Sequence, residues 1–321
     1  MSASSTAQAA KCLFLAWLLL APRPGAVAVG AAPSGAPGDT LSVVFTGDVL
    51  LDRGVREFIG RRGVDALFSP SVDSLFRASD LVVANLECPV TKIKAPVQKI
   101  YIFRGEPEWL PALRRHGITH LNLANNHSID QGREGLADTW QQVRQAGMVP
   151  VGAAPTMDQA AEPVLLASLP RPVYLVPTLQ LALENFAYLP HRPSVSNESM
   201  DSLVARVARL RQQCPTAYII VSPHWGGEHT LRPLLQQKHD AKRLIDAGAD
   251  VLIGHHTHTL QPVDTYRGHS IYYSIGNFIF DQRRPINTSA CAVQIKITGT
   301  GAEVLTLPVT IKNCIARIDE R

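Results

Sequence analysis

Short apolar runs alternate with amphipathic helical patterns through most of the chain, and this alternation constrains the fold more than any other feature. The runs LSVVFTG, DLVVANL and AYIIVS are rich in β-branched residues, as strands are. Between such runs, segments like REGLADTWQQVRQAG and LLQQKHDAKRLIDAG repeat apolar residues at helical spacing and end at glycine. Alternating strands and helices predict an α/β layered fold with a largely parallel or mixed sheet.

Polar side chains stand where the predicted strands end. In chain order they are Asp48, Glu87, Asn126 with His127, His224, and His256 with His258. Ligands of open α/β sheets bind beyond the carboxyl ends of the strands, so these residues can converge although they are far apart in sequence. Imidazole nitrogens with carboxylate or amide oxygens suit borderline divalent metals. Each residue alone also has a structural interpretation as a cap or turn residue, and only the joint pattern predicts a site.

The segment ADVLIGHHTH adds a more specific expectation. If the strand continues through it, His256 and His258 lie on one face, because side chains alternate with a period of two. His255 then points away from the site.

The N-terminus resembles a targeting segment. Lys11 precedes the ten-residue apolar run CLFLAWLLLA, which is too short to span a bilayer comfortably as a helix. Pro22 and Pro24 follow, and the small residues AVA at 26–28 form a cleavage pattern. We predict a signal peptide over 1–28, a flexible lead-in over 29–40, and export to the periplasm, the medium or the outer face of the cell membrane. An uncleaved anchor is the alternative.

Composition argues against some classes of function. The formal charge is +4 with scattered Lys and Arg, and aromatic residues make up 6% of the chain, so we expect no nucleic-acid partner. The five cysteines include no CxxC pair, so a zinc–thiolate site is not expected and no disulfide pairing is indicated.

Six motifs in this order resemble the poly-gamma-glutamate capsule biosynthesis (CapA) family of the calcineurin-like metallophosphoesterase superfamily. They are FTGDVLLDRG, ANLECPVT, LANNHSIDQGREGLADT, SPHWGGEHT, DAGADVLIGHHTHTLQPVD and YYSIGNFIFDQ. The resemblance implies a domain over 41–312 with the four-layered α/β/β/α sandwich of metallo-dependent phosphatases. Residues 313–321 would then form a C-terminal tail.

The resemblance also implies roles for single residues. The implied metal ligands are Asp48, Glu87, Asn126, His224, His256 and His258. His127 matches the catalytic acid or oxyanion stabiliser, and the implied cofactor is one or two divalent ions, with Mn, Zn or Fe all compatible with these ligands. Leu50 departs from the pattern, because it stands where the superfamily usually has a further His ligand. Glu87 departs too, because it replaces the usual bridging Asp. The number of ions therefore stays open.

Four further residues are candidates for orienting ligands or binding substrate: Arg53, Arg104, Glu228 and Asn277. Asp130 is expected to cap the helix that follows it rather than to bind metal.

Two functions remain open at this stage. One is an exported CapA-type protein of poly-gamma-glutamate synthesis or export that carries a metallophosphoesterase-like metal site. The alternative is an extracytoplasmic metal-dependent phosphoesterase or other hydrolase unrelated to capsule. The expected partners are an anionic polymer or phosphoester substrate and membrane-bound components of polymer synthesis. His127 favours hydrolysis, and Leu50 favours binding without chemistry.

Overall fold

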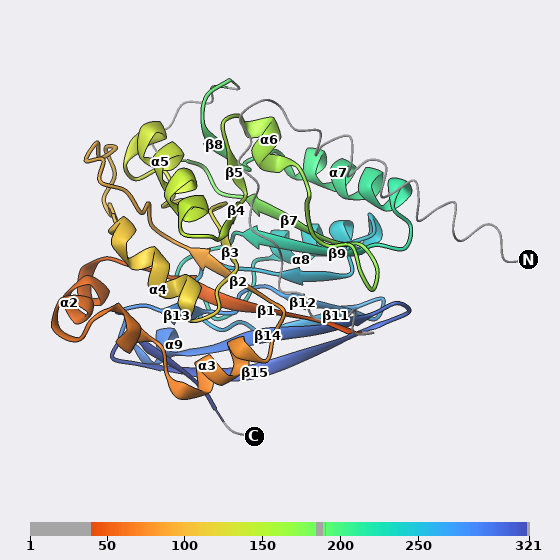
Figure 1. Ribbon diagram of the computed structural model, residues 1–321. Coiled ribbons are helices and arrows are strands. Elements are labelled where there is room, and N and C mark those ends of the chain that lie inside the picture. Colours follow the sequence, from red (N-terminus) through yellow and green to blue (C-terminus); the bar gives the residue numbers. More distant parts are fainter. Residues whose placement is uncertain (1–39, 184–188, 190, 320–321) are drawn as a thin grey trace, which may run out of the picture.

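Two β-sheets pack face to face, and helices cover the outer face of each (Figure 1). The computed structural model describes residues 40–183, 189 and 191–319, so the predicted signal peptide lies outside the described residues. The layers follow the order helices, sheet, sheet, helices. This is the predicted four-layered α/β/β/α sandwich, and the prediction is confirmed.

The first sheet has eight strands in the order β16-β15-β14-β1-β2-β3-β4, with β13 paired to the end of β1. Strands β1 to β4 are parallel to one another, whereas β14 to β16 are antiparallel. The bounds are β1 Thr40–Val49, β2 Leu81–Leu86, β3 His120–Asn122, β4 Val149–Val151, β13 Asn277–Ile279, β14 Ser289–Thr298, β15 Ala302–Lys312 and β16 Ile315–Ile318.

The second sheet has six strands in the order β11-β12-β10-β9-β7-β6. Its four central strands are parallel. The bounds are β6 Val164–Ala167, β7 Val173–Leu179, β9 Tyr218–His224, β10 Val251–Ile253, β11 Val263–Tyr266 and β12 His269–Tyr272. A separate small pair joins β5 Ala153–Ala154 to β8 Ser194–Val195.

The helices divide between the two outer faces. Helices α2, α3, α4 and α5 pack on the first sheet, and α7 and α8 pack on the second. The bounds are α2 Arg53–Arg62, α3 Pro70–Arg77, α4 Leu110–Arg115, α5 Gly132–Gln145, α6 Met157–Ala161, α7 Met200–Gln213, α8 Leu235–Asp246 and α9 Pro285–Thr288, with short 3-10 turns at Val64–Leu67 and Pro107–Trp109.

Alternating side chains along the strands build the layers. In β1, Val43 and Phe45 enter the core between the sheets, where they join Leu175 and Ile220 of the second sheet. Val44, between them in sequence, enters the outer core beneath the helices. Because both faces of the central strands are buried, they are apolar throughout, as is typical of covered parallel sheets.

Several details differ from the sequence expectations. Ile315–Ile318, expected in a C-terminal tail, form β16 at the sheet edge, because Asn313 and Cys314 adopt positive φ and turn the chain back. Strand β10 ends at Ile253, so the following histidines lie in a loop.

The four cysteines of the described residues are all free and buried. Among the described residues, no helix is both long and apolar enough to cross a membrane.

Candidate metal centre

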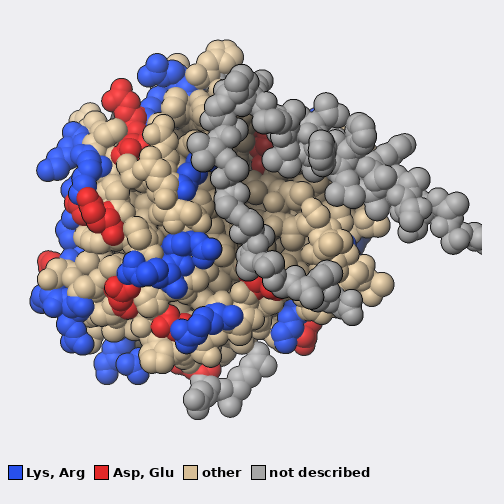
Figure 2. Space-filling model, viewed as in Figure 1, with Lys and Arg blue, Asp and Glu red and all other residues tan. Residues whose placement is uncertain are grey.

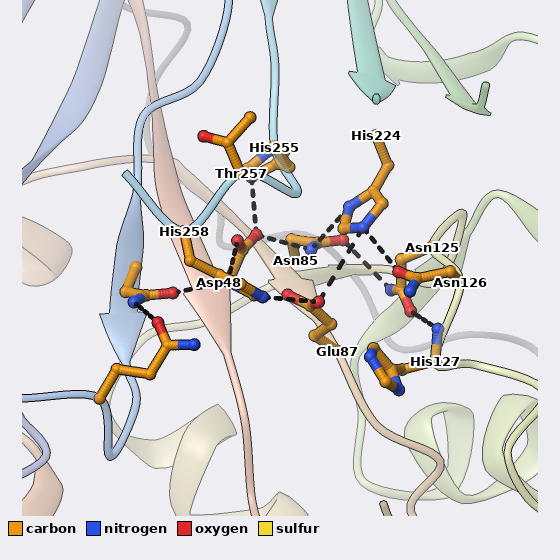
Figure 3. A network of polar contacts seen from close by, with 12 residues as sticks. Asp48, Asn85, Glu87, Asn125, Asn126, His127, His224, His255, Thr257 and His258 are labelled. Carbon is orange, nitrogen blue, oxygen red and sulfur yellow. Dashed lines mark hydrogen bonds and ion pairs between the residues drawn. The ribbon is translucent and has the colours of Figure 1, made fainter. Parts of the chain in front are cut away.

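The carboxyl ends of β1, β2 and β9 and the loops after β3 and β10 bring the predicted ligands together. Asp48, Glu87 and His224 are completely buried. Figure 3 shows their side chains and that of His258 directed toward one another, with Asn126 beside His224. Residues scattered along the sequence therefore share one place, as strand-end convergence in α/β sheets predicts.

Two groups of potential ligands share Glu87. One group is Asp48, Glu87 and His258, and the other is Glu87, His224 and His256, with the ligand atoms of each group within 4.8 Å of one another. His258 Nε2 lies 3.5 Å from Glu87 Oε1, and His224 Nε2 lies 4.0 Å from the same oxygen. Glu87 can therefore bridge two ions or serve one.

Asn126 extends the second group. Its Oδ1 lies 2.9 Å from His224 Nε2, which places an amide oxygen beside one histidine of that group. The predicted set of six ligands thus divides into a side with Asp48 and His258 and a side with Asn126, His224 and His256, joined by Glu87.

The unpaired atoms at this centre fit a divalent cation. Both carboxylate oxygens of Glu87, Asp48 Oδ2 and His256 Nδ1 are buried without a hydrogen-bond partner. Burying carboxylate oxygens without partners is costly unless a cation or a proton compensates. Carboxylate oxygen with imidazole nitrogen is a donor set that Mn, Zn and Fe accept. The residues present therefore suit a divalent metal of this kind.

The pKa shifts of the two carboxylates also indicate a site for a cation. Burial raises the pKa of Glu87 well above its ordinary value, and the nearby charge of Asp48 raises it further. Burial favours a raised pKa for Asp48 as well, but contacts with His255 and His258 outweigh burial and hold its pKa well below the ordinary value. Two buried carboxylates so close together need a positive charge between them if both are to ionise.

The imidazoles are held in the form that binds metal. Burial lowers the pKa of His224 well below its ordinary value, and His256 lowers it further. Burial, followed by the neighbouring His258, lowers the pKa of His256 to about 4. Neutral imidazole is the metal-binding form, so little proton release from these rings opposes binding near neutral pH.

The loop after β10 corrects one expectation. His256 and His258 both reach the site, but through a turn with φ of 95° and 57° rather than through strand alternation. Residues other than glycine rarely adopt such backbone angles, and those that do cluster at functional sites. The expectation that His255 points away is wrong, because the turn leaves its Nδ1 3.2 Å from Asp48 Oδ1.

A close approach of two strands places Asn277. A Cβ on Gly47 would lie 2.1 Å from the carbonyl oxygen of Gly276, so only glycine lets β1 and β13 meet here. Asn277 pairs with Asp48 across these strands, and its Oδ1 lies 3.0 Å from His258 Nδ1. Asn277 thereby orients a predicted ligand, the kind of contact that fixes a metal-binding imidazole.

His127 stands beside the ligand groups with its own acidic partner. His127 Nδ1 lies 2.7 Å from Asp130 Oδ2, and Lys99 Nζ lies 3.0 Å from Asp130 Oδ1. Burial lowers the pKa of His127, although the hydrogen bond to Asp130 opposes this shift. The expectation that Asp130 caps a helix is wrong: α5 begins at Gly132 after Gln131, and Asp130 instead accepts from His127 and from the Phe103 amide.

Sequence reasoning missed two asparagines. Asn85 Nδ2 donates to Asp48 Oδ1 at 2.8 Å, and Asn125 Oδ1 accepts from the His127 amide at 3.1 Å. A signal for Asn85 was present, because it precedes Glu87 by two residues and so shares its face of the strand. Asn125 gives no such signal, since turn asparagines are common.

A small cavity of about 120 Å³ opens above the centre. Its lining residues are Arg53, Tyr101, Phe103, His127, Glu228, His229, His258, Phe280 and Gln282. Two of the four further candidates, Arg53 and Glu228, thus face the cavity. Arg104 is not among its lining residues, and its guanidinium is bound to Glu106 and to the Thr91 carbonyl.

A family model and two relatives show which proteins this chain is similar to. Residues 42–282 match the family model described as bacterial capsule synthesis protein PGA_cap. The PGA biosynthesis protein CapA of Bacillus subtilis (strain 168) is 31% identical over 271 residues, which cover 82% of this chain and 70% of the relative. The capsule biosynthesis protein CapA of Bacillus anthracis is 29% identical over 281 residues, covering 85% and 68%.

One solved structure supports the fold. The sulfate thiohydrolase SoxB of Thermus thermophilus superposes with a TM-score of 0.51 at 13% identity, covering 87% of this chain and 58% of that one. At this identity the likeness concerns the fold alone. Given the family model, which spans most of the described chain, and the two Bacillus relatives, the chain belongs to the bacterial capsule synthesis protein PGA_cap family.

Proposed function

We propose that this chain is an extracytoplasmic, divalent-metal-dependent hydrolase that acts in the synthesis or export of poly-gamma-glutamate. The observation that carries the proposal is the position of His127. It lines the same cavity as the predicted ligand His258 and is hydrogen-bonded to the buried carboxylate of Asp130. A site that only held metal would not need a further imidazole, outside the ligand groups, oriented in this way.

The two ligand groups would hold the metal, with Glu87 between them. Divalent ions bound there supply Lewis acidity and lower the pKa of a coordinated water. Because Asp130 accepts from His127 Nδ1, the other ring nitrogen of the neutral imidazole carries a lone pair, which can take up a proton in the cavity and then return it to a leaving oxygen. Arg53 offers a positive charge at the cavity wall, where it is held by Asp281.

The proposed link to capsule polymer is based on the family to which the chain belongs. The Bacillus relatives are named for PGA and capsule biosynthesis, and this chain matches them over most of its length. Extracytoplasmic location is supported by the apolar run before AVA at 26–28. Membrane-bound components of polymer synthesis are the protein partners that fit such a role.

A second candidate function is binding of the polymer without hydrolysis. Leu50 favours it, because this fully buried side chain occupies the place of a ligand expected from the superfamily and leaves the Asp48 side with fewer donors. A hydrolase unrelated to capsule is a third reading of the same geometry, since a cavity of about 120 Å³ admits a small ester or phosphoester group.

Metal analysis combined with a hydrolysis screen tests the proposal. The purified protein is dialysed against Mn, Zn or Fe, its metal content is measured, and phosphoester, ester and glutamyl-amide substrates are assayed. We expect bound metal and turnover, both abolished in His256→Ala/His258→Ala. The matched control is His239→Ala/His269→Ala, which removes two imidazoles outside the centre. Full metal content in the first variant would refute the assigned site, and bound metal without turnover on any substrate would favour the binding function.

A further inference from the structure

A basic cavity of about 550 Å³ lies beside the metal centre. It is bounded by α2, the loop after β13 and the turn between β15 and β16. Its lining includes Arg61 and Arg62 from α2, Arg283 from the loop and Lys312 from the end of β15. In Figure 2, Lys and Arg side chains crowd the edge of the molecule where Figure 1 places α2.

The charges of this basic cavity are not balanced from within. Arg61, Arg62, Arg283 and Lys312 are exposed, and none of them forms an ion pair with any residue that the structure describes. Two acids line the same cavity, but Asp281 is already bound to Arg53 and to the Gly54 amide. Only Glu57 remains to oppose four cations. Unpaired like charges around a concave surface attract and concentrate anions.

The basic cavity shares a wall with the metal centre. Gln282 lines both the basic cavity and the small cavity above the ligands. Its Oε1 accepts from Asn277 Nδ2 at 3.0 Å, and Asn277 Oδ1 lies 3.0 Å from His258 Nδ1. The side chains of Gln282 and Asn277 thus connect a predicted metal ligand to the edge of the basic cavity. The two cavities are therefore neighbours with one lining residue in common.

We propose that the basic cavity binds a segment of a polycarboxylate chain whose adjoining residues lie at the metal centre. The proposal rests on the proposed function and deepens it, because it specifies an extended substrate with regularly spaced carboxylates. A cavity of about 120 Å³ holds one reacting group, whereas the cavity of about 550 Å³ has room for further residues of the same chain. Binding at two adjoining places raises affinity for oligomers over single residues.

The test is a titration with a fluorescein-labelled oligomer of gamma-linked glutamate, followed by anisotropy in chelator at low salt. Chelator removes any contribution of metal, so the binding that remains comes from the protein's own side chains. The variant is Arg61→Ala/Arg283→Ala/Lys312→Ala. The control is Arg77→Ala/Arg209→Ala/Lys296→Ala, which removes the same net charge from exposed positions outside the basic cavity. Monomeric glutamate and polyphosphate serve as comparison ligands.

We expect the cavity variant to bind the oligomer at least about tenfold more weakly and with a smaller salt dependence, whereas the control stays within about twofold. Equal affinity in the cavity variant and the native protein would overturn the proposal. So would an equal loss in the control, or tight binding of polyphosphate with none of the glutamate oligomer. Should the triple variant fail to fold, Arg61→Gln and Arg283→Gln singly must each weaken binding.

The result of this titration can be distinguished from the result of the metal and hydrolysis assays that test the proposed function. His256→Ala/His258→Ala leaves the basic cavity intact, so under chelator it should bind the oligomer as the native protein does. Loss of turnover in that variant concerns the metal centre, and loss of oligomer binding in the cavity variant concerns the basic cavity.

Discussion

Replacing Glu87 with glutamine should separate the stability of the metal-free protein from its ability to bind metal. Glu87 is completely buried, belongs to both ligand groups, and has two carboxylate oxygens without partners. Glutamine keeps the size and shape but removes the charge. In chelator, Glu87→Gln should therefore be more stable than the native protein at alkaline pH, while its metal affinity should fall on both sides of the centre.

The magnitude follows from the separation of the two carboxylates. Ligand atoms of Asp48 and Glu87 lie within 4.8 Å, and two unit charges at about that distance repel by about 3.5 kcal/mol at an effective dielectric constant of about 20. Because the pKa of Glu87 is raised in the folded protein, its contribution to stability is fully present below the unfolded pKa. It is lost as pH rises through the folded pKa. The advantage of the variant should grow over that range toward about 3 kcal/mol.

Urea unfolding across pH provides the assay, with chelator in one series and saturating Mn in the other. In chelator the curves of native protein and Glu87→Gln should diverge as pH rises. In Mn at about a thousand times its Kd the order should reverse, because such a ligand adds about 4.1 kcal/mol to the native protein, which exceeds the variant's advantage of about 3 kcal/mol. Glu303→Gln, an exposed change on β15, is the control. A metal-free variant less stable than the native protein at every pH would refute the reasoning.

Three other outcomes are expected. His127→Ala should keep its metal while turnover falls about 10²–10⁴-fold, whereas His224→Ala should lose both, and equal metal loss in the two variants would contradict the separate role of His127. Gly47→Ala should lower the free energy of unfolding and the metal content together, since a Cβ would lie 2.1 Å from the Gly276 carbonyl; a fully metal-loaded, equally stable variant would count against the close approach. N-terminal sequencing of secreted protein should begin near Val29, and a start at Met1 would mean that the leader is retained.

The layered fold could be predicted from the sequence because the strands and the helices each show a strong apolar pattern. Buried parallel strands give continuous apolar runs, and helices that cover them give an apolar stripe with glycine at the end. Segments such as Gly132–Gln145 and Leu235–Asp246 show the second pattern, with Gly147 and Gly248 just after them, and form α5 and α8. The tail after 312 was not accessible, because its strand depends on two consecutive residues with positive φ, Asn313 and Cys314, that are not glycine.

The sequence was enough to predict most residues of the metal centre, but not the contacts between them. Strand-end position was enough to indicate Asp48, Glu87 and His224, since every central strand ends at the same edge. The pairing of His127 with Asp130 was not, because a residue three positions later reads equally well as a helix cap. Periodicity placed His255 on the wrong side, since it assumes a strand where the chain has already turned.

The environment of Asp48 bears on the departure at Leu50. Leu50 is fully buried in the outer core and cannot contribute a donor atom. Yet the Asp48 carboxylate is not left unsupported: Asn85 Nδ2 donates to Oδ1 at 2.8 Å, and His255 Nδ1 lies 3.2 Å from the same oxygen. These contacts restrain Oδ1 and leave Oδ2, which has no hydrogen-bond partner, on the side of His258. A carboxylate oriented in this way can present a single oxygen to a cation without the missing imidazole. The Asp48 side would then bind its ion through fewer protein donors than the His224 side, so stepwise removal of metal should empty the Asp48 side first.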